Sequence, residues 1–373
     1  MEEGAIMLLS NVTSIPPTGG AITEVTDMTN TTTTLPESSS SIVVIVEQVL
    51  IVFAIIAIHL GMGGATDHLE LRDNLRRPWG VAAAIATQFF LMPAVAMALI
   101  YLFDLSYGYA IGTIIMASSP GGALSNVLSY WSKSDVSLSI CMTTCSSAFA
   151  FVALPVLLLL FSEVFASDET IKVPFKSVAI TLTMIFVPSA LGVLIRYKSS
   201  RIGDVFAEVC SIAGCIGIVA FVIVMFVDSP EIINASYEAY VVSLALPLIG
   251  FSIGYFLATL LKQIPYKRRA VAIETGYQNV GLALAIFTLS YQGDPVILEM
   301  QTIPIFYGLA STLYALITIG LYKLYLRRKE RDVIEEKVAL LVDDDNYDET
   351  SRIKDLSYGS TSGVKDDFKE SRP

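Results

Sequence analysis

Long apolar segments follow one another along most of the chain, separated by short polar stretches. Nine of them qualify as helices that cross a bilayer: 42–64, 78–102, 107–131, 136–162, 177–195, 204–227, 238–261, 268–291 and 298–325. The hydrocarbon core of a bilayer is about 30 Å thick, so that a crossing helix needs about 20 apolar residues. The pattern therefore predicts an all-α, polytopic membrane protein with nine transmembrane helices.

The two ends of the chain differ from this apolar region in composition. Residues 1–41 contain no Lys or Arg and are rich in Thr and Ser, while residues 327–373 are polar and include an acidic run at 343–345. Such segments cannot bury enough apolar surface to fold, and both are expected to be disordered. The short, acidic start of the chain argues against a cleaved signal peptide. We thus expect a tail at 1–41, a transmembrane domain at 42–326 and a tail at 327–373.

Lys and Arg residues gather in alternate loops, which predicts the orientation of the helices. One set of loops, with the C-terminal tail, holds Arg72, Arg76, Arg77, Lys133, Arg196, Lys198, Arg201, Lys262, Lys267, Arg268, Arg269, Arg327, Arg328, Lys329 and Arg331. The opposite loops hold only Lys172 and Lys176. Cytoplasmic loops carry the excess of basic residues, so the N-terminus is expected outside and the C-terminus in the cytoplasm. The sequons at Asn11, Asn30 and Asn234 then all lie outside, as N-glycosylation requires.

The composition excludes several classes of protein. Only 16% of the residues are charged, against about a quarter in soluble proteins. The net charge of −11 arises mostly in the loops and tails, and no nucleic-acid motif or suitable basic patch occurs. The four cysteines lie inside apolar segments, which favours packing over disulfides or a zinc site. No cofactor is predicted.

Two of the nine segments are interrupted by polar and helix-breaking residues. The third contains Ser118-Ser-Pro-Gly-Gly122, and the eighth contains Glu274-Thr-Gly-Tyr-Gln-Asn-Val-Gly281. Proline and glycine predict an unwound hinge near residues 120–122. Irregular backbone and ionisable groups at membrane depth are tolerated only inside protein or beside a water-filled cavity, and they mark functional sites. The alternative for Glu274 is a side chain that reaches back to the inner interface.

The two interrupted segments also resemble each other. Each contains small polar residues and glycine followed by Asn-Val, at Asn126 and at Asn279, and the predicted topology makes them cross the membrane in opposite directions. Two discontinuous helices of this kind point to a secondary transporter built from inverted repeats. Segments five to nine would form one repeat, and segments one to four the other without its first helix.

Three stretches resemble the sodium-binding core of the bile acid:sodium symporter family (solute carrier family 10). They are Pro120-Gly-Gly-Ala-Leu-Ser-Asn-Val127, Ser139-Ile-Cys-Met-Thr-Thr-Cys-Ser146 and Glu274-Thr-Gly-Tyr-Gln-Asn-Val280, and the resemblance extends over about 42–326. It implies a plasma-membrane symporter that imports bile acids or related amphipathic organic anions, such as steroid sulfates, with sodium by alternating access. It also implies that the two broken helices cross in a core domain (78–102, 107–131, 136–162, 238–261, 268–291 and 298–325). A panel domain (42–64, 177–195 and 204–227) would move against this core.

The resemblance assigns residues to two sodium sites. One would use Ser125, Asn126, Ser139, Thr143 and Glu274; the other would use Gln88, Glu274, Gln278 and carbonyls of 275–277. Asn279 would face the substrate cavity. Sodium prefers such oxygen ligands, and residues four apart share a helix face. The alternatives are that the hydroxyls bond their own helix, that Gln88 bonds a neighbouring helix, and that Asn279 makes a structural bond across the crossing.

One position departs from the family pattern, and other functions remain open. Gly281 stands where vertebrate bile-acid carriers typically have glutamine, so bile acids, sulfated steroids and other organic anions stay open as substrates. A receptor and a member of the family that has lost transport are the competing hypotheses. An enzyme is not expected, because no nucleophile–base pair is evident and His59 and His68 are isolated. Whether the chain forms homo-oligomers is left open.

Overall fold

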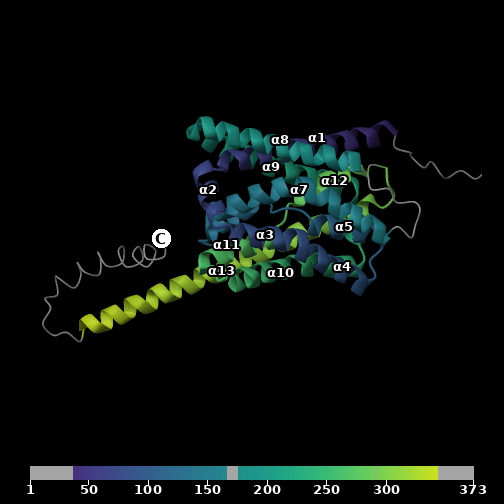
Figure 1. Ribbon diagram of the computed structural model, residues 1–373. Coiled ribbons are helices and arrows are strands. Elements are labelled where there is room, and N and C mark those ends of the chain that lie inside the picture. Colours follow the sequence, from purple (N-terminus) through teal and green to yellow (C-terminus); the bar gives the residue numbers. More distant parts are fainter. Residues whose placement is uncertain (1–36, 166–174, 292, 343–373) are drawn as a thin grey trace, which may run out of the picture. The chain divides into compact units, whose positions relative to one another are not determined.

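The computed structural model describes residues 37–165, 175–291 and 293–342, and these residues form helices without any strand beyond one isolated bridge (Figure 1). The helices are α1 (Glu37–Ala65), α2 (His68–Arg76), α3 (Trp79–Ala86), η1 (Thr87–Leu91), α4 (Met92–Phe103), α5 (Tyr107–Ala117), α6 (Leu124–Trp131), α7 (Val136–Phe165), α8 (Phe175–Lys198), α9 (Ser200–Asp228), η2 (Pro230–Asn234), α10 (Tyr237–Leu260), α11 (Pro265–Gly276), α12 (Val280–Ser290) and α13 (Ile297–Val342). The expectation of an all-α fold is confirmed for this part of the chain.

Among the described residues, seven helical segments are long and apolar enough to cross a membrane. They are Ile42–Ala65, Trp79–Phe103, Val136–Phe161, Val178–Lys198, Ser200–Asp228, Tyr237–Leu260 and Ile297–Glu335. Each corresponds to one predicted segment. Many of their large apolar side chains are exposed, as a helix that faces lipid requires. The protein is therefore a multi-pass membrane protein.

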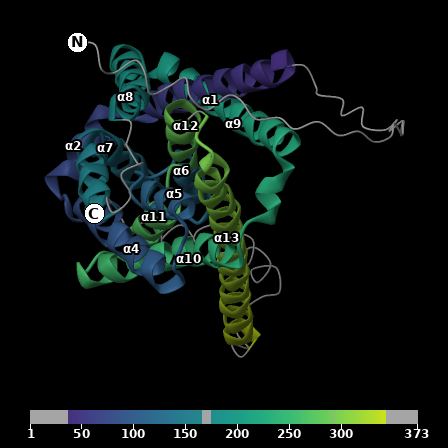
Figure 2. The ribbon, with the colours of Figure 1, turned by 90° about the vertical axis from the view of Figure 1, so that its right-hand side faces the viewer.

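The remaining two predicted segments each form two short helices with a break between them. α5 ends at Ala117 and α6 begins at Leu124, while α11 ends at Gly276 and α12 begins at Val280. The predicted hinge at 120–122 is confirmed, since these residues lie in the first break. In both views the broken helices lie between the other elements (Figures 1 and 2).

Glycines bring α1, α8 and α9 into close contact, and the three helices lie together in both views (Figure 2). A Cβ on Gly63 of α1 would lie 2.1 Å from the carbonyl oxygen of Ser189 in α8. A Cβ on Gly214 of α9 would lie 2.8 Å from the backbone nitrogen of Ile58 in α1. Small residues allow this approach of helix backbones in membranes, where dispersion contacts hold helices together. These three helices are called the α1–α8–α9 group below.

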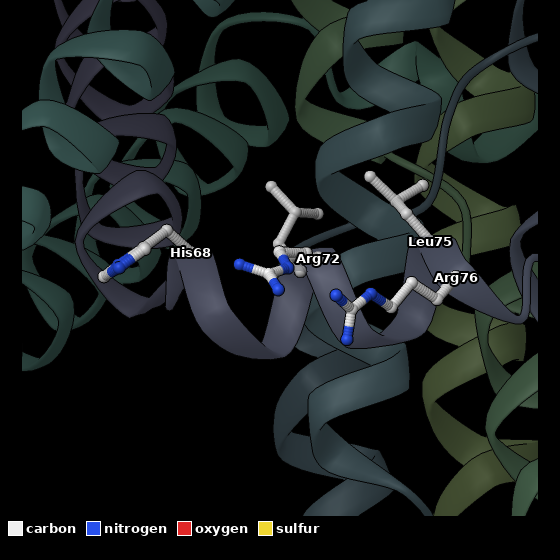
Figure 3. Close-up of a pocket in the computed structure, with 5 residues that line it drawn as sticks. His68, Arg72, Leu75 and Arg76 are labelled. Carbon is white, nitrogen blue, oxygen red and sulfur yellow. The ribbon is translucent and has the colours of Figure 1, made fainter.

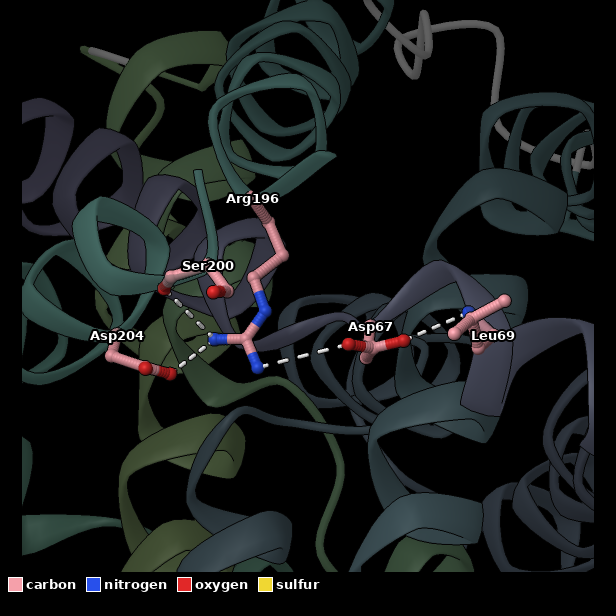
Figure 4. Close-up of polar contacts among 5 residues, drawn as sticks. All are labelled: Asp67, Leu69, Arg196, Ser200 and Asp204. Atoms are coloured by element: carbon pink, nitrogen blue, oxygen red, sulfur yellow. Dashed lines mark hydrogen bonds and ion pairs between the residues drawn. The ribbon is translucent and has the colours of Figure 1, made fainter. Parts of the chain in front are cut away.

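The helix α2 was not predicted, because the stretch between the first two segments reads as a loop. Its N-cap is Asp67, whose carboxylate accepts a 2.8 Å hydrogen bond from the backbone N–H of Leu69 (Figure 4). Asp67 also lies 3.9 Å from Arg196 of α8, which pairs in turn with Asp204 of α9. The pKa of Asp67 lies below its usual value, mainly because its carboxylate accepts the hydrogen bond from Leu69 N–H. Arg196 makes a smaller contribution. This network links the ends of α2, α8 and α9.

The polar end of the described chain corrects one expectation. α13 continues as helix through residue 342, whereas the sequence predicted a disordered tail from residue 327. Interspersed acidic and basic residues favour the helix, as in the pair Arg331–Glu335 at 3.6 Å, one turn apart. Similarly, α1 begins at Glu37, inside the expected N-terminal tail. Residues 1–36 with Asn11 and Asn30, and residues 343–373, lie outside the described residues.

Candidate functional site

The two helix breaks lie against each other and complete each other's backbone hydrogen bonds. The N–H of Gly122 donates to the carbonyl of Tyr277 at 3.0 Å, and the N–H of Asn279 donates to the carbonyl of Pro120 at 2.8 Å. Gly121 and Gln278 form an isolated antiparallel bridge. Backbone groups freed by unwinding must find partners inside a membrane, and here each break supplies those of the other.

Glu274 lies in the last turn of α11 at this junction and is fully buried, with its carboxylate directed into the protein. Oε2 accepts hydrogen bonds from Ser125 Oγ at 2.7 Å and from Ser139 Oγ at 3.2 Å. Oε1 accepts a hydrogen bond from Thr143 Oγ1 at 2.6 Å. The alternative in which Glu274 reaches back to the inner interface is therefore wrong.

No cationic side chain is seen within ion-pair distance of Glu274 in the described part of the chain. A buried carboxylate without a counter-charge is costly, even with three hydrogen bonds. This imbalance favours a bound cation at the junction.

Asn126 and Thr143 extend the first predicted set of sodium ligands. Thr143 Oγ1 lies 3.4 Å from Oδ1 of Asn126 and 3.0 Å from the carbonyl of Ser139 in its own helix. A hydroxyl has only one proton to donate, and its shortest contact is the one to Glu274. All five predicted members of the first set thus lie together, contributed by α6, α7 and α11.

Gln88 and Gln278, from the second predicted set, each present a buried oxygen without a partner. The Nε2 of Gln88 donates to the carbonyl of Glu274 at 3.1 Å, and that of Gln278 donates to the carbonyl of Ala117 at 3.0 Å. Because a carbonyl only accepts, these contacts fix which end of each amide carries the oxygen. Oε1 of both residues is buried and has no hydrogen-bond partner. Buried polar atoms are normally paired, and two free acceptors favour a cation or water beside them.

A single turn of π-helix places Gln88 in this position. η1 spans Thr87–Leu91 within an otherwise α-helical segment, and the extra residue per turn turns Gln88 toward the junction. Thr87 Oγ1 lies 2.9 Å from Thr275 Oγ1 across the same interface. Two of the carbonyls expected in the second set already accept hydrogen bonds, those of Gly276 from Tyr307 and of Tyr277 from Gly122. Each keeps a second lone pair for a further ligand.

Asn279 faces the α1–α8–α9 group, where it contacts His59, a residue to which the sequence assigned no role. Its Nδ2 lies 3.1 Å from Nε2 of His59, and its Oδ1 caps α12 by accepting the N–H of Leu282 at 3.0 Å. His59 is 2% exposed and is not isolated, as the sequence suggested. Its place in the sequence could have drawn attention to His59, because it is the only histidine inside a predicted transmembrane segment.

The atoms at the junction that could coordinate a cation are carboxylate, hydroxyl, amide and carbonyl oxygens. Hard monovalent and divalent cations prefer such ligands, and sodium suits a site with one full negative charge. The four cysteines, all within the described residues, form no disulfide. Cys141 and Cys145 belong to an apolar cluster with Leu138 and Met142, as the sequence predicted for them.

The surface also carries a shallow hollow along α2. It has a volume of about 360 Å³ and is lined by His68, Leu71, Arg72, Leu75 and Arg76, all from α2 (Figure 3). The two guanidinium groups make it basic, so it does not suit a cation.

Comparisons with known proteins agree with this chemistry. Residues 52–236 match the Sodium Bile acid symporter family. A "Sodium-dependent organic anion transporter" of Rattus norvegicus is 33% identical over 287 residues, covering 75% of this chain and 77% of that protein. An "Ileal sodium/bile acid cotransporter" of Oryctolagus cuniculus is 30% identical over 278 residues, covering 74% of this chain and 79% of that protein. A "Sodium/bile acid cotransporter 4" of Rattus norvegicus is 33% identical over 321 residues, covering 84% of this chain and 72% of that protein.

The similarity to these three relatives extends well beyond residues 52–236, and it includes several apolar helices that are long enough to cross the membrane. The members of this family are transporters and not enzymes, in agreement with the expectation from the sequence. The chain belongs to the sodium bile acid symporter family.

Proposed function

We propose that this protein imports an amphipathic organic anion, such as a bile acid or a steroid sulfate, together with sodium by alternating access. The observation that carries the proposal is the buried carboxylate of Glu274, which lies at the meeting point of two helix breaks without a cationic partner among the described residues. The names of the similar proteins support the class of substrate.

We further propose two sodium ions near this carboxylate. The first binds among Ser125, Asn126, Ser139, Thr143 and Glu274. The second binds beside the unpartnered oxygens of Gln88 and Gln278, with Glu274 and nearby carbonyls. Sodium would satisfy those oxygens and balance the carboxylate, and Asn279 would lie next to the organic anion.

The architecture that fits this mechanism has nine transmembrane segments in an inverted repeat. The α5–α6 and α11–α12 pairs would each cross the membrane as one broken segment, in addition to the seven long helices. The α1–α8–α9 group would be the panel, and the other segments the core that moves against it. The close glycine contacts within the α1–α8–α9 group support its movement as one body.

The proposed location is the plasma membrane, with the N-terminus outside and the C-terminus in the cytoplasm. The distribution of Lys and Arg among the loops supports this orientation. Asn11, Asn30 and Asn234 would then be open to glycosylation.

The test is uptake of labelled bile acids and steroid sulfates by cells that express the protein, with sodium or choline outside. We expect uptake of at least one anion in sodium and only background uptake in choline. Glu274→Gln should reduce sodium-dependent uptake to background while the protein still reaches the surface, because the amide has the same shape but no charge. Glu299→Gln is a matched control, since that carboxylate also accepts a serine hydroxyl, that of Ser106, but outside the junction. Normal sodium-dependent uptake by Glu274→Gln would contradict the proposed site.

A further inference from the structure

The pair formed by His59 and Asn279 has a fixed direction of hydrogen bonding. The carbonyl of Ile55 lies 2.9 Å from Nδ1 of His59, and because a carbonyl only accepts, Nδ1 carries a proton. The Oδ1 of Asn279 is held by the N–H of Leu282, so its Nδ2 is the end that faces His59. Nε2 of His59 must therefore accept from Nδ2 of Asn279. The imidazole is neutral, and the pair consists of one acceptor and one donor.

The pair joins α1 to the break between α11 and α12. His59 belongs to α1, which contacts α8 and α9 through glycines, while Asn279 belongs to the break between α11 and α12. The surroundings are apolar on the side of α9, where a Cβ on Gly281 would lie 2.9 Å from Cδ1 of Ile218. A buried hydrogen bond in such surroundings costs much when it opens without replacement. Any movement of the α1–α8–α9 group against the broken helices must separate this pair.

We propose that a substrate hydroxyl replaces this hydrogen bond, and that His59 thereby determines specificity for hydroxylated anions. A hydroxyl both accepts and donates, so that it can take the N–H of Asn279 and donate to Nε2 of His59. The oxygens of a sulfate or carboxylate only accept and leave Nε2 unpaired. This inference rests on the proposed function, because it places the substrate at Asn279.

The first experiment measures how much a ring hydroxyl contributes to uptake in each variant. Taurocholate has several free ring hydroxyls, taurolithocholate has a single one and taurolithocholate 3-sulfate has none, and their kcat/KM values are measured on the same cells. His59→Met should lower the preference for the most hydroxylated substrate about fivefold or more, because a lost neutral hydrogen bond is of that size. His59→Gln, whose amide oxygen can still accept, should keep most of the preference.

Each preference is a ratio within one variant, so differences in expression cancel. A structural role of His59 would lower uptake of all three substrates alike and leave the ratios unchanged. Unchanged ratios in His59→Met would overturn the inference. Absence of sodium-dependent uptake of any anion by the unmodified protein would instead contradict the proposed function.

A second experiment measures the unmodified protein and needs no change at His59. The chain contains two histidines, so that ¹⁵N-labelled histidine gives two imidazoles, and His68→Gln assigns them. We expect saturating taurocholate to leave Nε2 of His59 with the chemical shift of a hydrogen-bonded nitrogen. Taurolithocholate 3-sulfate, which has no free ring hydroxyl, should shift it toward the value of a free nitrogen. If His59 responds identically to both, or to neither, the proposed contact with a hydroxyl is wrong.

Discussion

Thr143 Oγ1 donates a 2.6 Å hydrogen bond to Oε1 of Glu274, which is the shortest contact of that carboxylate with a hydroxyl. The bond joins the N-terminal part of α7 to the last turn of α11, next to the break between α11 and α12. Because both side chains are fully buried, neither has water as an alternative partner. The hydroxyl oxygen keeps lone pairs for a cation while its O–H points at the carboxylate.

Removing this hydroxyl should weaken sodium binding more than it weakens the fold. Thr143→Val keeps the shape of the side chain but removes both the donor to Glu274 and one oxygen ligand. A hydrogen bond to a charged group contributes about 1.5–3 kcal/mol, so the sodium concentration for half-maximal uptake should rise about tenfold or more. Thr302→Val is the control, because Thr302 is also buried but bonds only the carbonyl of Leu298 in its own helix. Equal sodium dependence in the two variants would contradict the assignment of Thr143.

A methyl group on Gly121 should disrupt the junction. Its Cβ would lie 1.9 Å from Oε1 of Glu274, so that Gly121→Ala must displace the carboxylate from the three hydroxyls. Overpacking of this kind costs about 1–3 kcal/mol, and uptake should fall to background. Gly320→Ala is the matched control, since a Cβ there has nothing within 4 Å. Surface labelling and a thermal unfolding assay check both variants; sodium-coupled uptake by Gly121→Ala at the normal rate would contradict the geometry.

The sequence allowed the prediction of those features that depend on residue type and local order. A proline followed directly by two glycines, at 120–122, disfavours a continuous helix more than a lone proline such as Pro155 inside α7 does, so the hinge followed from the sequence. Glu274 and the polar residues around it stood out because such groups are costly inside apolar segments. Gln88, Ser139 and Thr143 were expected at the junction only through the resemblance to the symporter family.

Features that depend on tertiary contacts did not follow from the sequence. His59 looked isolated because its partner Asn279 is distant in the chain, and no local pattern connects α1 with α12. The π-turn at η1 was missed for a similar reason, since it is stabilised by contacts of Thr87 and Gln88 with α11. The helix α2 and the extension of α13 beyond residue 327 depend on a cap and on ion pairs that a reading of hydrophobicity does not register.

Replacing Gln88 should remove one sodium ion rather than all coupling. Gln88→Leu deletes the unpartnered Oε1 and keeps similar volume, while the ligands of the first proposed site remain. We expect the dependence of uptake on sodium to change from sigmoidal toward hyperbolic, with a Hill coefficient that falls from near two toward one. Gln301→Leu is the control, because Gln301 is also buried but bonds Thr288 instead of the junction. An unchanged sigmoidal curve in Gln88→Leu would exclude Gln88 from the second site.

The proposed orientation can be tested at the sequons. Asn234 is exposed at the end of η2, and Ser236 of its sequon also caps α10 by accepting the N–H of Ala239 at 3.3 Å. Asn234→Gln removes the acceptor for the glycan but leaves this cap intact, so any change in mobility on a gel reports the glycan and not a loss of folding. With the N-terminus outside, removal of N-glycans by an endoglycosidase should increase the mobility of the unmodified protein. The increase should disappear when Asn11, Asn30 and Asn234 are all replaced by Gln. Since glycans are added only on the side of the membrane that becomes extracellular, a protein that carries none at any of the three positions would contradict the proposed topology.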